Sequence, residues 1–250
     1  MLLVIDVGNT RVKVFVYEGD VVLFNEAFEH EFFLEEILKI FQKFDKISRS
    51  VLSSVGNIDE SVLDFLKLKS DLLIIDSESK VPFVNNYATP KTLGVDRMVL
   101  AAGAVLKYPK TNRLIIDAGT CITYDFVSAE DVYLGGGISP GLRLRYESLH
   151  AYTAKLPLLG FKNPDSLIGN STAEAIHSGV VNGFVNEIRG IIGEYEKQFV
   201  NLAIILTGGD SMLLSDKIKN SIFVNPNFLI ESLKALQEYI SKDKWLKKLY

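Results

Sequence analysis

Residues 2–22 read LLVIDVGNTRVKVFVYEGDVV, and residues 113–133 read RLIIDAGTCITYDFVSAEDVY. Both stretches contain an apolar strand, then Ile-Asp-x-Gly with a threonine close behind, then a second strand and an acidic turn. Aligned without a gap, Asp6 lies over Asp117 and Gly8 lies over Gly119. Self-similarity of this kind indicates that one structural unit occurs twice in the chain.

A second pair of segments extends this internal repeat. Residues 47–56 (ISRSVLSSVG) and 202–209 (LAIILTGG) are apolar strands that end in small residues and glycine. Helix-like segments lie between the strands, at residues 31–44, 61–67, 96–106, 172–199 and 230–246. Alternating strands and helices favour an α/β fold with a mixed sheet in each half. We therefore predict two similar lobes, residues 1–110 and 111–250, with an active-site cleft between them.

The composition excludes several classes of protein. Hydrophobic residues make up 48% and charged residues 23% of the 250 positions, which is enough apolar material for a core. The net charge of -4 gives no basic footprint for nucleic acid. The opening MLLVIDVGNT has no basic region of a signal peptide, and no stretch approaches the ~18 apolar residues of a membrane span. The single cysteine, Cys121, fits a reducing compartment. We expect a cytoplasmic protein without nucleic-acid or membrane partners, and a buried Cys121.

The repeated loops have the composition of phosphate-binding turns. Asp6-Val7-Gly8-Asn9-Thr10-Arg11-Val12-Lys13 delivers a carboxylate to the end of a strand, and the glycine turn that follows can aim backbone N–H groups at a phosphate. Lys13 lies on the return strand, within reach of a polyphosphate. Asp117-Ala118-Gly119-Thr120 repeats the design. Because carboxylates repel phosphates, the two aspartates are better explained as ligands of cations that neutralise the phosphates.

Two further glycine turns bear on chemistry. Leu206-Thr207-Gly208-Gly209-Asp210-Ser211 could let a flat ring or a sugar lie against the backbone, or could be a plain strand-to-helix turn. Gly94-Val95-Asp96-Arg97 begins a helix with a carboxylate beside a guanidinium. A kinase that acts on an alcohol needs a carboxylate to take the hydroxyl proton and a cation to hold an anionic substrate. An aspartate in the first turn of a helix can equally be a cap, so both readings stay open.

The ordered set of motifs resembles the superfamily of acetate kinases, sugar kinases, Hsp70 and actin. The order and spacing are most similar to the type III pantothenate kinases. The matching pieces are residues 6–10, 94–97, 117–120, 135–141 (GGGISPG), 153–157 (TAKLP), 169–172 (GNST) and 206–209. Each motif is weak by itself, and the resemblance rests on their order from residue 6 to residue 209.

The resemblance implies an activity and a set of site residues. It implies ATP-dependent phosphorylation of pantothenate to 4'-phosphopantothenate, the first step towards coenzyme A, by a homodimer. It implies that Asp96 is the general base and that Asp117 binds a monovalent cation, potassium or ammonium. Asp6 would hold magnesium, directly or through a water molecule. The implied ATP-binding residues are Asp6, Val7, Gly8, Asn9, Thr10, Arg11, Val12, Lys13, Thr120, Gly208 and Gly209. The implied pantothenate-binding residues are Tyr87, Gly94, Val95, Asp96, Arg97 and Thr172.

Two other classes of protein remain as alternatives to a type III pantothenate kinase. Another small-molecule kinase of the same fold, such as a sugar or acetate kinase, usually has a longer chain with larger substrate loops. A non-enzymatic nucleotide-binding regulator of the same family has no use for a base and an arginine beside a phosphate site. For the homodimer, we expect the contact in residues 172–199, whose apolar residues exceed the needs of one buried face: Ile176, Val180, Val181, Phe184, Ile188, Ile191 and Ile192.

Overall fold

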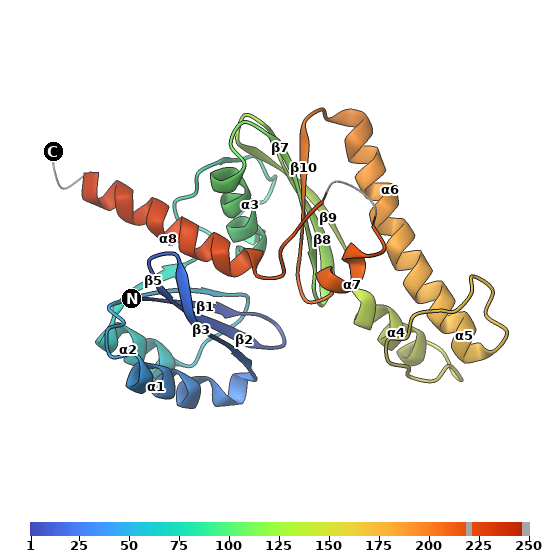
Figure 1. The fold of residues 1–250 in the computed structure, drawn as a ribbon, viewed down its shortest axis with the longest axis horizontal. Helices are drawn as coiled ribbons and strands as arrows, with labels where there is room; N and C mark the ends of the chain where they lie inside the picture. Colours follow the sequence, from blue (N-terminus) through green and yellow to red (C-terminus); the bar gives the residue numbers. More distant parts are fainter. Residues whose placement is uncertain (219–221, 247–250) are drawn as a thin grey trace. The chain divides into compact units, whose positions relative to one another are not determined.

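The structure, a computed structural model, describes residues 1–218 and 222–246. The chain separates into two compact units (Figure 1). The first unit combines Met1–Lys107 with the last helix, which begins at Phe228, and the second is Tyr108–Asn227. The expected second lobe of residues 111–250 differs from this division, because the last helix packs against strands and a helix of the first unit.

The first unit contains a five-stranded sheet in the order β3-β2-β1-β4-β5. β1 is antiparallel to β2 and parallel to β4, so residue 6 lies opposite residue 13 on one side and residue 53 on the other. The elements are β1 (Leu2–Val7), β2 (Val12–Glu18), β3 (Val21–Phe28), α1 (Phe33–Lys43), β4 (Arg49–Ser54), α2 (Glu60–Lys69), β5 (Asp71–Ile75), β6 (Val84–Asn85), α3 (Val95–Lys107) and α8 (Phe228–Leu246), with 3-10 turns at His30–Phe32 and Pro90–Thr92.

Alternation along the central strand assigns its side chains to two faces of this sheet. Leu3, Ile5 and Val7 point to a core that includes buried residues of α1 and α2. The residues between them in sequence face the other side, where α8 packs against β1 and β4 and α3 packs against β4. Figure 1 shows α1 and α2 on one side of the sheet and α8 on the other. A mixed sheet buried on both faces explains why β1 is apolar almost throughout.

The second unit repeats this arrangement. Its strands lie in the order β9-β8-β7-β10-β11, with β7 antiparallel to β8 and parallel to β10. Among these five strands the order of neighbours is the same as among their counterparts in the first unit, which confirms the predicted repeat. The elements are β7 (Asn112–Ala118), β8 (Cys121–Val127), β9 (Val132–Pro140), α4 (Leu142–Ala151), α5 (Thr172–His177), α6 (Gly183–Gln198), β10 (Leu202–Thr207), α7 (Ser211–Ser215) and β11 (Ile222–Val224).

The helix predicted for residues 172–199 is present with one irregularity. A π-helical turn at Ser178–Asn182 joins α5 to α6, so the rod runs as one body from Thr172 to Gln198. Of the seven apolar residues that were expected in the dimer contact, six are buried in the core of the second unit and Ile191 is partly buried. These residues are therefore not surplus to one buried face, and the expectation that they form the dimer contact is wrong. The sheet and α4 of the same chain supply enough partners to cover them.

One smaller expectation is also wrong. Cys121 is exposed, not buried, because it is the first residue of β8 and directly follows the Gly119-Thr120 turn. The side chains that alternate with it along the strand, beginning with Ile122, point into the core instead.

Candidate functional site

The first predicted loop forms a tight turn between β1 and β2. The Gly8 N–H donates to the carbonyl oxygen of Arg11 (N···O 3.1 Å), and a Cβ at residue 8 would lie 3.3 Å from that oxygen. Glycine therefore suits this position. Asn9 and Thr10 are exposed at the tip. The turn presents polar groups at the end of a buried strand, as the sequence predicted.

Asp6, at the end of β1, is buried beside three polar or charged groups of the same unit. Ser53, on the neighbouring strand β4, donates a hydrogen bond from its hydroxyl group to Asp6 Oδ1 (3.2 Å). Burial raises the pKa of Asp6 to about 6, against the opposing effects of Lys13 and the Ser53 hydrogen bond. The charge of Asp96 raises this pKa further. Asp6, Lys13, Ser53 and Asp96 therefore belong to one electrostatic site.

The start of α3 positions Asp96 and Arg97. The Oδ1 of Asp96 accepts a hydrogen bond from the Arg97 N–H (2.8 Å), and the Met98 N–H donates to the Gly94 carbonyl (3.0 Å). A Cβ at residue 94 would lie 2.5 Å from Asp96 Oδ1, so a glycine leaves room for this carboxylate. Asp96 thus has the capping contact that the sequence left open, and it also lies near Asp6.

Arg97 and Tyr87 form a second pair in the first unit. Arg97 is 6% exposed, and its guanidinium carbon lies 5.8 Å from the centroid of the Tyr87 ring. The Tyr87 backbone is fixed by its N–H, which donates to Asn85 Oδ1 (3.1 Å). Three of the residues implied for the substrate site, Tyr87, Asp96 and Arg97, are therefore neighbours in the fold although the first and the last are ten positions apart in the sequence.

The second loop occupies the equivalent place in the second unit. The Gly119 N–H donates to the Cys121 carbonyl (3.0 Å), and the Thr120 carbonyl accepts from the Gly141 N–H (3.1 Å). A Cβ at residue 141 would lie 2.3 Å from the Gly119 oxygen. The glycine before α4 therefore lets the start of this helix pack directly on the loop. Thr120 is exposed at the turn.

Gly208 brings the third motif against this loop. Its φ of +93° lies in the region that favours glycine. A Cβ at this residue would lie 2.4 Å from Asp117 Oδ1 and 2.5 Å from the Ala118 carbonyl oxygen. The Asp210 N–H also donates to the Ala118 carbonyl (3.0 Å). The structure thus joins Asp117, Thr120, Gly208 and Gly209 in one part of the second unit.

Two residues of these groups were absent from the expected site. Ser53 contacts Asp6, and the only signal for it was the small-residue end of the strand at residues 47–56. Asp210 is half-buried, and burial raises its pKa. It stands directly after the two glycines in the third motif. Thr172, another residue implied for the substrate site, begins α5 in the second unit.

The described residues offer carboxylates for a metal only in small numbers. Within residues 1–218 and 222–246, no three His, Cys, Asp or Glu side chains gather as a ready-made metal site. Asp6 and Asp96 are a pair, and Asp117 is a single carboxylate with a carbonyl oxygen close by. Such sparse sites suit Mg²⁺, which is commonly held by one or two carboxylates together with substrate phosphates.

Among the helices that the structure describes, none is long and apolar enough to cross a membrane.

Two units with one sheet topology, each with an Asp-x-Gly turn after its first strand, define the class of actin-like ATPase folds. Solved structures of this class are similar to the chain. The activator of the 2-hydroxyisocaproyl-CoA dehydratase from Clostridium difficile, with bound ADPNP, has a TM-score of 0.54 at 13% identity, covering 100% of this chain and 97% of that chain. MreB 5 of Spiroplasma citri, bound to AMPPNP, has a TM-score of 0.53 at 14% identity, covering 98% of each chain.

Sequence similarity is more specific than the fold. Residues 2–194 match the family described as type III pantothenate kinase. The type III pantothenate kinase of Flavobacterium johnsoniae is 57% identical over 240 residues, which cover 96% of this chain and 98% of that protein. The chain belongs to the type III pantothenate kinase family.

Proposed function

We propose that this kinase transfers the γ-phosphoryl group of ATP to the hydroxyl of pantothenate, which gives 4'-phosphopantothenate and ADP in the first step of coenzyme A biosynthesis. Membership of the family carries the proposal. The geometry supports it, since a carboxylate at the start of α3 lies in the same electrostatic site as the buried aspartate of the first loop. Phosphoryl transfer depends mainly on positioning and on neutralising charge.

The residues around α3 have the chemistry to hold the acceptor. Asp96 orients the pantothenate hydroxyl and accepts its proton as the new O–P bond forms and the bond to ADP breaks. Arg97 binds the pantothenate carboxylate, which a guanidinium can do through two parallel hydrogen bonds. Tyr87, packed on Arg97, bounds the same site. Gly94 and Val95 line it through their backbone, and Thr172 contributes its hydroxyl.

ATP binds in this proposal through both loops and the glycine pair. Residues 6–13 form the first loop, in which Lys13 meets the phosphates, and Thr120, Gly208 and Gly209 supply the remaining contacts. The buried carboxylate of Asp6, whose pKa is raised to about 6, favours a cation beside it. Magnesium would be held there together with the ATP phosphates, where it would neutralise their charge.

We place a monovalent cation, potassium or ammonium, at Asp117. Asp117 Oδ1 and the Ala118 carbonyl oxygen both lie so close to residue 208 that only glycine fits there. These two oxygens are the ligands that we propose for the cation. Oxygen ligands of this kind suit a hard cation. A cation there would offset the repulsion between this carboxylate and the polyphosphate.

A homodimer is also part of the proposal, with a contact surface different from the one expected from the sequence. The segment between α4 and α5 exposes large apolar side chains in the second unit: Tyr152 (89%), Leu158 (58%), Phe161 (43%), Leu167 (77%) and Ile168 (82%). Exposed apolar groups in such number are typical of a protein interface. A second copy of this chain is the occupant we propose.

A cytoplasmic location fits the lone, unpaired Cys121.

A coupled assay of ADP release tests the proposed substrate, the proposed cation and the two alternative classes of protein. Pantothenate, acetate and a panel of sugars are offered with ATP and magnesium, in buffers containing either potassium or only sodium. Among the acceptors offered, we expect only pantothenate to be phosphorylated, and only in buffers that contain potassium or ammonium. Turnover with a sugar or acetate would favour another small-molecule kinase, and binding of ATP without any turnover would favour a regulatory protein. Full activity in sodium would contradict the assignment of Asp117.

A further inference from the structure

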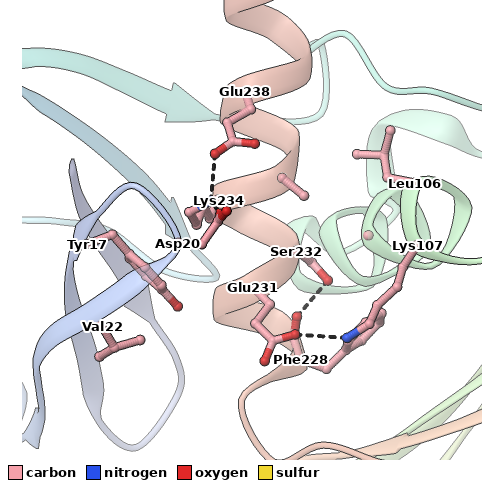
Figure 2. Close-up of a pocket in the computed structure, with 12 residues that line it drawn as sticks. Tyr17, Asp20, Val22, Leu106, Lys107, Phe228, Glu231, Ser232, Lys234 and Glu238 are labelled. Carbon is pink, nitrogen blue, oxygen red and sulfur yellow. Dashed lines mark hydrogen bonds and ion pairs between the residues drawn. The ribbon is translucent and has the colours of Figure 1, made fainter. Parts of the chain in front are cut away.

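A cavity of about 370 Å³ lies within the first unit, at the opposite end of α3 from Asp96. Its walls come from the β2–β3 hairpin, the last turn of α3 and the first turns of α8 (Figure 2). Leu106 and Lys107 line it, and ten residues of helix between Asp96 and Leu106 correspond to roughly 15 Å. The cavity is therefore separate from the residues proposed for phosphoryl transfer.

Hydrogen-bond donors face this cavity from the hairpin and from α8. Lys234, with a side chain only 12% exposed, donates to Asp20 Oδ1 (2.8 Å) and Glu238 Oε1 (2.6 Å). The ammonium group also lies 5.7 Å from the centroid of the Tyr17 ring, and the third of its protons can be donated to a ligand acceptor. Tyr17 is 5% exposed, and its hydroxyl points into the cavity (Figure 2). Among the described residues, none forms a hydrogen bond with this hydroxyl.

The phenol of Tyr17 remains a donor at neutral pH. Burial raises its pKa above the ordinary value of 10.0, and the charge of Glu231 adds to this rise, while Lys234 opposes it. Glu231 is itself held by Lys107 (3.1 Å). The Tyr17 hydroxyl and the Lys234 ammonium thus offer two donors to an acceptor group placed between the hairpin and α8.

The remaining wall is largely apolar. Val22 of the hairpin, Leu106 of α3 and Phe228 and Ala235 of α8 line the cavity. Figure 2 shows Val22 and Leu106 at opposite sides of it. A ligand that fills this space therefore needs an apolar body as well as an acceptor group.

Charge selects among the acceptor groups. The Asp20 side chain is 97% exposed, and an exposed ion pair contributes little. A ligand carboxylate can take the place of the Asp20 carboxylate on Lys234 without changing the total charge of the cavity. The other four charged groups of the lining are paired with one another, Lys107 with Glu231 and Lys234 with Glu238, so only the charge of Asp20 is replaced by that of the ligand.

We propose that this cavity is an effector site for a small amphipathic carboxylate, bound by Tyr17 and Lys234 and by the apolar wall. The route to the kinase site is α3 itself. This helix crosses α8 so closely that a Cβ at Gly103 would lie 1.9 Å from Ser232 Oγ. A ligand held between α8 and the last turn of α3 therefore acts on the helix whose first turn contains Asp96 and Arg97.

The test uses three probes with the same apolar body: hexanoate, hexanol and hexylammonium. Each is titrated into the ¹⁵N-labelled full chain, and the amide signals of Val22 and Lys107 are followed. We expect hexanoate to shift both signals, with hexanol about tenfold weaker, as for the loss of one charge-assisted hydrogen bond, and hexylammonium without effect. Stronger binding of hexylammonium, or no shift with millimolar hexanoate, overturns the proposal.

Variants separate this site from the pantothenate site. Ala235→Phe fills the cavity, and Tyr17→Phe removes only the hydroxyl; we expect no binding in the first and about tenfold weaker binding in the second. Tyr152→Phe is the matched control, and Arg97→Ala should leave the Val22 and Lys107 shifts intact. At saturating pantothenate, hexanoate should change kcat in the wild type but not in Ala235→Phe. Unchanged kcat in the wild type, or amide shifts that persist in Ala235→Phe, refutes the effector site.

Discussion

Asp96 has a capping contact in this structure and a proposed role as general base, and a single substitution can separate the two. Its Oδ1 accepts the Arg97 N–H at the start of α3, and it lies near Asp6. Asn caps helices about as well as Asp, so Asp96→Asn removes the base and keeps the cap. We expect kcat to fall by roughly 10²–10⁴-fold, with KM for pantothenate little changed. Steady-state kinetics of the purified variant measures both constants.

Arg97→Ala is the matched partner of that experiment. It removes the guanidinium that we propose binds the substrate in the ground state and the transition state alike, so it should chiefly raise KM for pantothenate. ATP affinity should survive in both variants. If Asp96→Asn keeps near-normal kcat, Asp96 is only a helix cap and the assignment of the base has to be abandoned.

Asp6 makes a prediction about stability. Its folded pKa of about 6 lies above its ordinary value of 3.8, so the folded state holds the proton more tightly than the unfolded state. This contribution is full below pH 3.8 and is lost as the pH rises through 6. At pH 7 the buried charge therefore costs up to about 3 kcal/mol. Asp6→Asn should stabilise the magnesium-free protein by up to that amount at pH 7, and hardly at all at pH 4.

Urea denaturation in the presence of a chelator measures this difference. The same variant should bind ATP with magnesium much more weakly, since the cation loses its carboxylate. A variant less stable than the wild type at pH 7 would show that the pKa of Asp6 is not raised in the folded protein.

At the scale of elements, the crossing of α3 and α8 depends on one missing side chain. Gly103→Ala would bring a Cβ within 2.4 Å of Ser232 Cβ and 2.9 Å of its Cα. Backbone atoms cannot rotate away, so the helices must separate, at a cost of about 1–3 kcal/mol. Thermal denaturation should show the loss.

Gly190→Ala is the control for that substitution. Gly190 is also inside a helix, α6, but a Cβ there would meet nothing within 4 Å. Alanine should then stabilise by about 0.4–1 kcal/mol, because it restricts the unfolded chain. Equal losses in the two variants would mean that Gly103 matters only for helix propensity.

The sequence predicts single elements well where a local pattern specifies them. The helices at α1, α2, α3 and α8 and the paired Asp-x-Gly hairpins follow from periodicity and glycine turns. α4 was missed, because its residues 142–151 alternate charged and apolar side chains without a clear helical stripe. Ser53 was missed because its role depends on the register between β1 and β4, which no local pattern reveals. The packing of α8 in the first unit was missed for the same reason, because it depends on contacts between residues far apart in the sequence.

At the scale of the whole molecule, the exposed apolar segment between α4 and α5 predicts the oligomeric state. Light scattering at micromolar concentration should give twice the chain mass of 27.9 kDa. Ile168→Asp, which places a charge on a side chain that is 82% exposed, should shift this mass towards that of one chain, because an unpaired charge is costly in an apolar interface.

Leu68→Asp is the control for the interface. Leu68 is 79% exposed and belongs to the first unit, whereas the proposed surface belongs to the second, and its substitution should leave the dimer intact. A wild-type mass near 27.9 kDa would exclude the homodimer, and an unchanged mass in Ile168→Asp would exclude this segment as the contact.

The return of α8 to the first unit bears on the order in which the protein is synthesised. Every residue of the second unit, Tyr108–Asn227, leaves the ribosome before α8 does. At about 5–20 residues per second, the side of β1 that includes Leu2 and Val4 waits on the order of ten seconds for its cover. Nascent chains that end at Asn227 and continue into a linker long enough to span the ribosome exit tunnel should therefore contain a protease-resistant second unit while the first remains open to cleavage. The half of the protein that is translated first would then be the last to mature.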